Sequence, residues 1–316
     1  MPADLTQWKQ HIDEARERVY ELAVETSVVE FPLDGFPPAL LKQEHLQKTG
    51  SFKLRGATNK ILSLTPEQAA RGVVTSSTGN HGLGVAAAAR HRGIQAEIFL
   101  PPQVPPQKVA ALEDYGASVT RVGNDPLEAE IAARHAATSS GRTYISPYND
   151  AAVIAGQGTI APELLRQVPR VDAVFVAVGG GGLISGIGAY LKTTSPETEV
   201  IGCWPRNSRV MYECLRVGRI LEVPERYTLS ESTAGGVEAG SITFELCQSV
   251  IDRSVLVGED EILTALRHAH KHGFAIEGAA ALAIAAFRQV AHEYQRKTAV
   301  IISCGGNPSP AVLSRI

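Results

Sequence analysis

Short apolar runs alternate with segments of helical spacing along most of the chain. The apolar runs have the length and composition of β-strands: Gly72–Thr75, Ala96–Leu100, Ser118–Val122, Thr143–Ile145, Ala173–Val178, Glu199–Cys203, Ser254–Val257 and Ala299–Ser303. The segments with helical spacing between them include His81–His91, Leu127–Ala137, Ile160–Gln167, Leu183–Lys192 and Asp260–His272. Strands that alternate with helices of this length predict parallel α/β sheets. The alternation alone does not decide between a closed barrel and two open sheets.

Two more helices are expected before the first of these strands. Residues 6–24 carry apolar side chains at helical spacing, and a second helix is expected from Phe52 to about Leu62. A short apolar run, Ala39–Lys42, lies between them. Toward the end of the pattern, Gly273 follows the segment 260–272, which fits a helix stop.

The composition is that of a globular protein of one large or two smaller domains, with 316 residues, a formal charge of −3, 44% hydrophobic and 20% charged residues. The near-neutral charge disfavours nucleic acid as a partner. No apolar run approaches the roughly 18 residues of a membrane span, and the N-terminus lacks the apolar core of a signal peptide. Four cysteines are too few and too scattered for a disulfide framework. We therefore expect a cytoplasmic protein with no membrane partner.

A run of four consecutive glycines is the strongest single motif. Gly179, Gly180, Gly181 and Gly182 follow the apolar run VDAVFVAV and precede a helical segment that starts at Leu183. Glycine lets backbone N–H groups approach a ligand closely, and a helix start adds a positive field, so this turn predicts a phosphate site. A simple turn needs one or two glycines, and each costs about 0.5–1 kcal/mol of ordering relative to alanine. The spacing matches neither the dinucleotide fingerprint nor a Walker loop.

The second motif is the turn TSSTGNHG, residues 75–82, again between a strand and a helix. One hydroxyl would suffice to cap that helix. The turn holds Ser76, Ser77 and Thr78 together with Asn80 and His81. Because these are more donors than a cap needs, they predict a site for the carboxylate of a substrate.

Two further turns carry reactive side chains. In KTGSFKLRG, residues 48–56, Lys53 stands at a helix start, which disfavours its cation, and a lowered pKa is what a Schiff-base lysine needs. In SCGGN, residues 303–307, Cys304 follows a strand. Taken alone, the simpler interpretation is a surface lysine at 53 and an inert cysteine at 304. Neither a His–Asp pair nor a zinc-binding spacing accompanies them.

Together and in this order, KTGSFKLRGA, SSTGNHG, GGGGL and SCGGN resemble the serine/threonine dehydratases and serine racemases, pyridoxal-phosphate enzymes of the tryptophan synthase β type. The resemblance includes AGQGTIAPELL at 155–165 and IEGAAALAIAA at 276–286, and so spans nearly the whole chain. It implies an α/β fold of two domains, each with a central, mostly parallel sheet flanked by helices. Residues 1–71 and 148–316 would form the large domain. Residues 72–147 would form a small inserted domain that closes on the substrate.

The resemblance also implies the cofactor, pyridoxal 5'-phosphate, and the residues around it. Lys53 would hold the cofactor covalently, and its ring and phosphate would meet Phe52, Asn80, Gly179, Gly180, Gly181, Gly182, Leu183 and Cys304. The substrate carboxylate would bind Ser77, Thr78, Asn80 and His81. Cys304 would face the ring nitrogen. A thiol cannot keep that nitrogen protonated as a carboxylate would, so the ring would be a milder electron sink, which suits β-elimination.

The implied reaction is β-elimination of water from a β-hydroxy amino acid such as L-threonine or L-serine, giving a 2-oxo acid and ammonia. Lys53, once displaced by the substrate, would remove the Cα proton. Racemases of the family carry a serine where this chain has Thr78, and that serine handles the proton on the opposite face. Thr78 is therefore a second catalytic candidate, and its extra methyl group counts against efficient racemisation.

Several alternatives and two accessory features complete the expectations. The alternatives are a serine racemase, a dehydratase for a modified substrate such as 3-hydroxyaspartate, a β-replacement synthase and a non-catalytic cofactor-binding protein. Some family members bind a divalent cation through acidic residues after the strand that here ends at Cys203. The corresponding WPRNSR, residues 204–209, has two arginines and no carboxylate, so no metal is expected there. A homodimer is usual among relatives and is expected.

Overall fold

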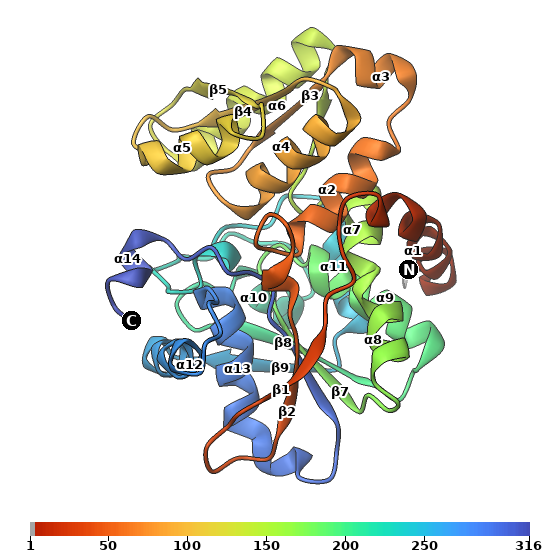
Figure 1. The fold of residues 1–316 in the computed structure, drawn as a ribbon, viewed down its shortest axis with the longest axis vertical. Helices are drawn as coiled ribbons and strands as arrows, with labels where there is room; N and C mark the ends of the chain where they lie inside the picture. Colours follow the sequence, from red (N-terminus) through yellow and green to blue (C-terminus); the bar gives the residue numbers. More distant parts are fainter. Residues whose placement is uncertain (1–3) are drawn as a thin grey trace.

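The computed structural model describes residues 4–316; residues 1–3, at the start of the predicted large domain, lie outside the described residues. The molecule is built around two separate open sheets (Figure 1). The alternation of strands and helices therefore resolves into two sheets and not into a closed barrel. No helix within residues 4–316 is long and apolar enough to cross a membrane.

The larger sheet has six strands in the order β1-β2-β10-β7-β8-β9. Their bounds are β1 Val28–Phe31, β2 Ala39–Lys42, β7 Ala173–Ala177, β8 Glu199–Pro205, β9 Arg253–Val257 and β10 Ala299–Ile302. The edge pair β1–β2 is antiparallel, and every other pairing in this sheet is parallel. The sequence pattern located β7 to β10 to within two residues at each end, while β1 carried no recognised strand signal.

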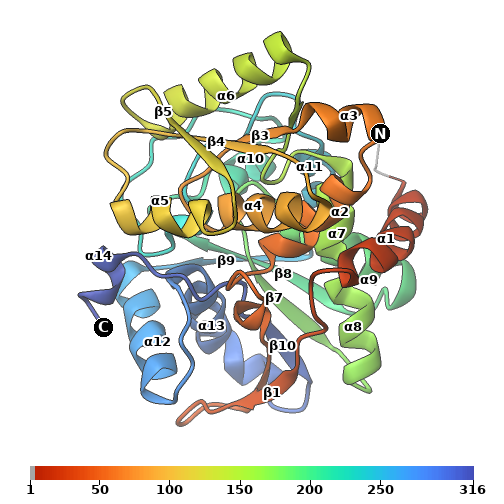
Figure 2. The ribbon, with the colours of Figure 1, turned by 45° about the horizontal axis from the view of Figure 1, so that its top comes forward.

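Helices cover both faces of the larger sheet, with α12 and α13 on one side and α1, α8 and α9 on the other (Figures 1 and 2). The helices of this part are α1 Leu5–Tyr20, α7 Ala151–Gly158, α8 Ile160–Gln167, α9 Gly182–Thr194, α10 Val210–Val217, α11 Ile242–Val250, α12 Glu259–Lys271, α13 Gly278–Val290 and α14 Pro310–Leu313. Three short 3-10 turns join them: η1 Glu44–Leu46, η2 Glu231–Thr233 and η3 Ala291–Tyr294. Burial of both faces explains why the central strands read as continuous apolar runs.

The smaller sheet has four parallel strands in the order β5-β4-β3-β6. Its strands are β3 Val73–Ser76, β4 Ala96–Leu100, β5 Ser118–Arg121 and β6 Thr143–Tyr144. The helices α3 Pro66–Arg71, α4 Asn80–Arg92, α5 Pro106–Glu113 and α6 Pro126–Ser140 accompany it. Figure 2 shows α4 and α5 on one face of the sheet and α6 on the other.

Helix α2, Lys53–Leu62, belongs to the hydrophobic cores of both sheets. Leu54 is part of the cluster around the larger sheet. Ala57 and Ile61, one and two turns further on, are part of the cluster around the smaller sheet. The helix packs against α4 and α7. It therefore forms the packed joint between the two sheets.

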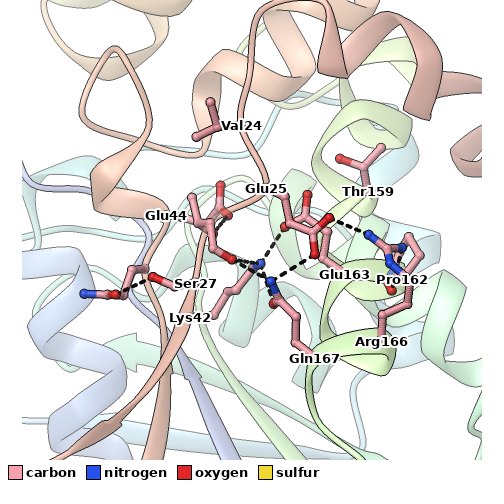
Figure 3. A network of polar contacts seen from close by, with 12 residues as sticks. Val24, Glu25, Ser27, Lys42, Glu44, Thr159, Pro162, Glu163, Arg166 and Gln167 are labelled. Carbon is pink, nitrogen blue, oxygen red and sulfur yellow. Dashed lines mark hydrogen bonds and ion pairs between the residues drawn. The ribbon is translucent and has the colours of Figure 1, made fainter.

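Four fully buried charges tie α2 to the larger sheet. Lys42 at the end of β2 donates to Glu163 at 2.5 Å, and Arg55 donates to Glu163 at 2.6 Å and to Glu44 at 2.7 Å. All four side chains are 0% exposed. Figure 3 shows Lys42 reaching Glu163 and Gln167 between η1 and α8. The two cations and two carboxylates balance, which is the condition for burying charge without a large penalty. We call these four residues the buried ion network.

Candidate active site

Three of the four turns singled out in the sequence meet at the start of α2. Two backbone hydrogen bonds hold the turn 303–307 against the turn 48–56. The N–H of Phe52 donates to the carbonyl of Cys304 at 3.0 Å, and the N–H of Gly306 donates to the carbonyl of Gly50 at 2.8 Å. The turn 75–82 joins them through Asn80, whose Oδ1 accepts from Nδ2 of Asn307 at 2.7 Å. Segments far apart in the chain thus build one site.

Lys53 is the first residue of α2, and its amine points into this site. Its Nζ donates to the carbonyl of Pro147 at 2.7 Å and lies 5.2 Å from the ring centroid of Phe52. Burial lowers the pKa of Lys53 to about 8, although nearby Cys304 and Glu277 act in the opposite direction. An amine with this pKa is partly neutral near pH 8, so it can act as a nucleophile or as a base.

The tetraglycine turn lies at the start of α9 and connects to Lys53 through the segment 147–148. A Cβ on Gly180 would strike the ring of Tyr148, which follows the carbonyl that Lys53 binds. Gly181 has φ of +87°, and a Cβ there would lie 2.7 Å from Sγ of Cys247. Glycine is therefore required at these positions by packing as well as by any ligand.

The same turn fits a phosphate group. No side chain of the described residues caps the start of α9, and the N–H groups of a first helical turn have no acceptor within the helix. These donors and the positive end of α9 form a site for an anion. Leu183, in the first turn, is buried. The hydroxyl of Thr243 donates to the carbonyl of Gly180 at 2.6 Å, so the turn is held by α11 as well.

A buried carboxyl group at the centre of the site was missed by the sequence analysis. Both oxygens of Glu277 accept from Nδ2 of Asn80, at 3.0 and 2.9 Å. Glu277 also accepts from the hydroxyl of Ser232 at 2.6 Å and from the N–H of Asn307 at 3.2 Å. Burial raises the pKa of Glu277. Its only sequence signal was the segment IEGAAA, which resembled the family but gave no reason to single out the glutamate.

Cys304 is buried at the opening of the turn 303–307, 3% exposed. Burial and the nearby Glu277 raise the pKa of Cys304 well above its ordinary value. The side chain is therefore a neutral thiol at any working pH, a weak donor or acceptor and not a charged partner. Phe52 beside it is half-buried.

The residues of the turn 75–82, predicted to bind a substrate carboxylate, lie in two different environments. Asn80 and His81 are buried; Nε2 of His81 hydrogen-bonds the carbonyl of Ile145 at 3.0 Å, while its Nδ1 has no partner among residues 4–316. Burial, together with the charge of Lys53, lowers the pKa of His81 to about 3, so this ring is neutral. No hydrogen bond within residues 4–316 links Ser77 or Thr78 to the amine of Lys53.

Thr78 lines a pocket of about 360 Å³ on the smaller sheet. Its other walls are the loop after β4, the start of α5 with Lys108, and residues 124–126, which lead into α6. This pocket lies at the carboxyl ends of β3, β4 and β5, the edge where open α/β sheets bind ligands. The structure therefore groups Asn80 and His81 with Lys53, and places Thr78 toward the smaller sheet.

Comparison with known proteins identifies the family. Residues 26–305 match the family described as pyridoxal-phosphate dependent enzyme. The L-threonine ammonia-lyase of Thermotoga maritima is 42% identical over 277 residues, which cover 87% of this chain and 69% of that protein. Threonine deaminase isoform 2 of Solanum lycopersicum, in its processed form, has a TM-score of 0.92 at 32% identity, covering 99% of this chain and 93% of that one. Maize serine racemase has a TM-score of 0.88 at 29% identity, covering 97% and 95%.

The chain belongs to the family of pyridoxal-phosphate dependent enzymes. The comparisons confirm the resemblance to the dehydratases and serine racemases and the α/β fold of two mostly parallel sheets. They also confirm pyridoxal phosphate as the cofactor of this enzyme. The residues described above fit that group: an amine of lowered pKa, an anion site at a helix start, and a neutral thiol.

Proposed function

We propose that this enzyme is a dehydratase that removes water from a β-hydroxy amino acid, L-threonine or L-serine, and releases a 2-oxo acid and ammonia. The observation that carries the proposal is the amine of Lys53, held at the start of α2 with a pKa of about 8 beside the turn that contains Cys304. The name L-threonine ammonia-lyase, borne by a relative that is 42% identical, supports the same activity.

Each part of the site has one task in this proposal. Lys53 would hold the cofactor covalently, the first turn of α9 and the tetraglycine turn would bind its phosphate, and Phe52, whose ring lies near Nζ of Lys53, would lie against the cofactor ring. When bound, pyridoxal phosphate supplies an electron sink for the bond electrons at the Cα of the amino acid. Lys53 takes up the Cα proton through Nζ, because an amine of this pKa is available as a base.

Asn80 and Cys304 set the surroundings of the ring. Asn80 would donate to the phenolic oxygen of the ring, and Glu277 positions Asn80 by accepting from its Nδ2. Cys304, a neutral thiol, would face the ring nitrogen and would leave that nitrogen unprotonated. A mild electron sink favours elimination, in which the departing hydroxyl group takes the electrons, over reactions that need a long-lived carbanion.

The turn 77–81 would bind the substrate carboxylate through its hydroxyls and through the first-turn N–H groups of α4, which include those of Asn80 and His81 and have no acceptor within the helix. The neutral ring of His81 donates through Nε2 to the carbonyl of Ile145, so its Nδ1 is an acceptor and the ring brings no charge to the site. Residues 72–147 form the small domain of this proposal and carry Thr78 with that turn. Closure of this domain on the substrate would bring Thr78 toward Lys53 and exclude water.

Racemisation is the second candidate function. The likeness to maize serine racemase favours it, as does the hydroxyl of Thr78, which would serve the face of the substrate opposite Lys53. The methyl group of Thr78 and the weak partner at Cys304 favour elimination instead. Chiral analysis of the amino acid recovered from an L-serine reaction separates the two, because a dehydratase leaves the L-form and a racemase generates the D-form.

The decisive experiment is an assay of 2-oxo acid release across L-threonine, L-serine and 3-hydroxyaspartate, with Lys53→Ala and Lys48→Ala compared in parallel. Lys48 lies in the same turn but is exposed, so it is a matched control. We expect release of 2-oxo acid from at least one substrate, complete loss in Lys53→Ala and wild-type rates in Lys48→Ala. Near-normal turnover by Lys53→Ala, or no product from any of the three substrates, would refute the proposal.

We further propose a homodimer that works in the cytoplasm. The four cysteines, all buried and unpaired within the described residues, fit a reducing compartment. Light scattering coupled to size-exclusion chromatography tests the dimer: a mass near 33.7 kDa would mean a monomer, and twice that mass is expected.

A further inference from the structure

A cluster of potential metal ligands lies outside the candidate active site, where the loop after β1 meets the end of α12. One ligand atom each from Asp34, His268 and His272 lies within 4.8 Å of the other two. Within residues 4–316 it is the one group of three or more histidine, cysteine and carboxylate side chains placed in this way. The loop between β1 and β2 lies at the end of the molecule away from the smaller sheet (Figure 1).

His268, in the last turn of α12, and His272, at the C-terminal cap of that helix, are four residues apart, a spacing that places them on the same side of the helix. Their ring centroids are 4.3 Å apart, with an angle of 41° between the ring planes. His268 also packs edge-on against Phe31 of β1, at 5.9 Å between ring centroids, so its position is fixed by the edge strand. Two histidines at this spacing on one helix face are a common way of binding a transition metal.

Each ring is already oriented by a backbone carbonyl. Nε2 of His268 hydrogen-bonds the carbonyl of Pro32 at 2.7 Å, and Nδ1 of His272 hydrogen-bonds the carbonyl of His268 at 2.9 Å. Since a carbonyl accepts, each of these ring nitrogens carries the hydrogen, and the other nitrogen of each ring keeps a free lone pair. Metal-binding histidines commonly have this hydrogen bond, in which one nitrogen donates to a carbonyl and the other is left available to an ion.

The carboxylate of Asp34 and the end of α12 favour a cation at the cluster, while Lys271 in the same turn opposes it. Asp34 is exposed and brings a carboxylate to the two imidazoles. The histidines occupy the last turn of α12 and its cap, where the carbonyl end of the helix is negative. Imidazole and carboxylate together select Zn²⁺ and similar transition metals over Mg²⁺, which prefers an all-oxygen shell.

We propose that Asp34, His268 and His272 form a binding site for one divalent transition-metal ion, of which Zn²⁺ is the test case. Metal–ligand distances of about 2.0–2.2 Å require the three ligand atoms, which lie within 4.8 Å of one another, to move closer together, and water completes the coordination. The bound ion joins the loop between β1 and β2 to α12. It therefore stabilises the edge hairpin of the larger sheet and takes no part in the reaction at Lys53.

The test is calorimetric titration of the metal-depleted holoenzyme with ZnCl₂, and separately with MgCl₂. The variants are His268→Ala, His272→Ala and Asp34→Asn, with His135→Ala, an exposed histidine on α6, as the control. We expect one Zn²⁺ per chain, weaker binding by at least about tenfold in each of the three site variants, and unchanged binding in His135→Ala. Saturating Zn²⁺ should raise the melting temperature of the wild type and not that of His272→Ala.

Three results would overturn the proposal. These are no Zn²⁺ binding by the wild type, undiminished binding in both histidine variants, or an equal loss in His135→Ala. Melting curves without metal show whether each variant is folded, and Asp34→Asn, an exposed change in a loop, keeps the test valid if a histidine variant unfolds. Because the readout is metal binding, its failure is distinguishable from failure of the proposed dehydratase activity.

Discussion

Glu163 is the residue on which the buried ion network depends most. Its two oxygens accept from Lys42 at 2.5 Å, from Arg55 at 2.6 and 2.9 Å, and from the hydroxyl of Tyr20 at 2.6 Å. The substitution Glu163→Gln keeps the size of the side chain and removes its charge. Lys42 and Arg55 are then balanced by Glu44 alone, and one unpaired positive charge remains in a fully buried site.

Breaking a buried ion pair by removing one partner costs about 3–5 kcal/mol. For a chain of 316 residues, an unfolding entropy of about 2.1 cal/mol/K per residue amounts to about 0.7 kcal/mol/K. The melting temperature of Glu163→Gln should therefore fall by about 4–7 °C. Differential scanning calorimetry of the holoenzyme measures this shift.

A matched control is the same substitution in an exposed ion pair. Glu293 accepts from Arg253 at 2.6 and 2.9 Å, but the two side chains are 40% and 32% exposed. Glu293→Gln should cost less than about 1 kcal/mol. The double variant Lys42→Met/Glu163→Gln restores charge balance and should recover part of the loss. If Glu163→Gln melts no lower than Glu293→Gln, burial of charge is not what makes this network important.

Three further outcomes are expected at the active site. Cys304→Ser should keep most of the elimination activity, because either group leaves the ring nitrogen neutral; a loss above about a hundredfold, roughly 2.7 kcal/mol, would show that the thiol does more. Glu277→Gln should weaken binding of pyridoxal phosphate about tenfold, measured by absorbance titration, because Asn80 loses a hydrogen bond to a carboxyl group worth about 1.5 kcal/mol; an unchanged dissociation constant would remove the positioning role. Gly181→Ala should lower the melting temperature, measured by calorimetry, and the affinity for the cofactor, measured by the same titration. Gly218 has a similar φ but open space around it, so Gly218→Ala should have smaller effects. Equal effects of the two substitutions would exclude crowding as the cause.

The strands of the fold were largely predictable because strand burial leaves a local signal. Ala96–Leu100 and Ile160–Gln167 were located to the residue as a strand and a helix. The strand Val28–Phe31 was missed, because it is an antiparallel edge strand with an exposed glutamate in a short run. The choice between a barrel and two sheets depends on which strands pair, and apolar periodicity contains no information about pairing.

The site was predictable where a motif has an unusual composition and unpredictable where it is assembled by the fold. Four glycines in a row stand out in any sequence. A single glutamate at 277 at the start of an apolar helix does not, and its importance appears only when Asn80, 197 residues away in the chain, is seen to donate to it. The buried ion network was hidden for the same reason, since Lys42 and Glu163 are 121 residues apart.

Helix α2 begins with the reactive lysine, continues with an arginine anchored in the buried ion network, and ends among side chains of the smaller sheet. A single helix therefore connects the amine of Lys53 with both sheets. A displacement of the smaller sheet must either move the C-terminal end of α2 with it or separate Ala57 and Ile61 from their neighbours in the smaller sheet's core. The position of the Lys53 amine is for this reason coupled to the position of the smaller sheet. A substitution in the last turn of α2, far from the reacting atoms, can therefore shift the alignment of this base.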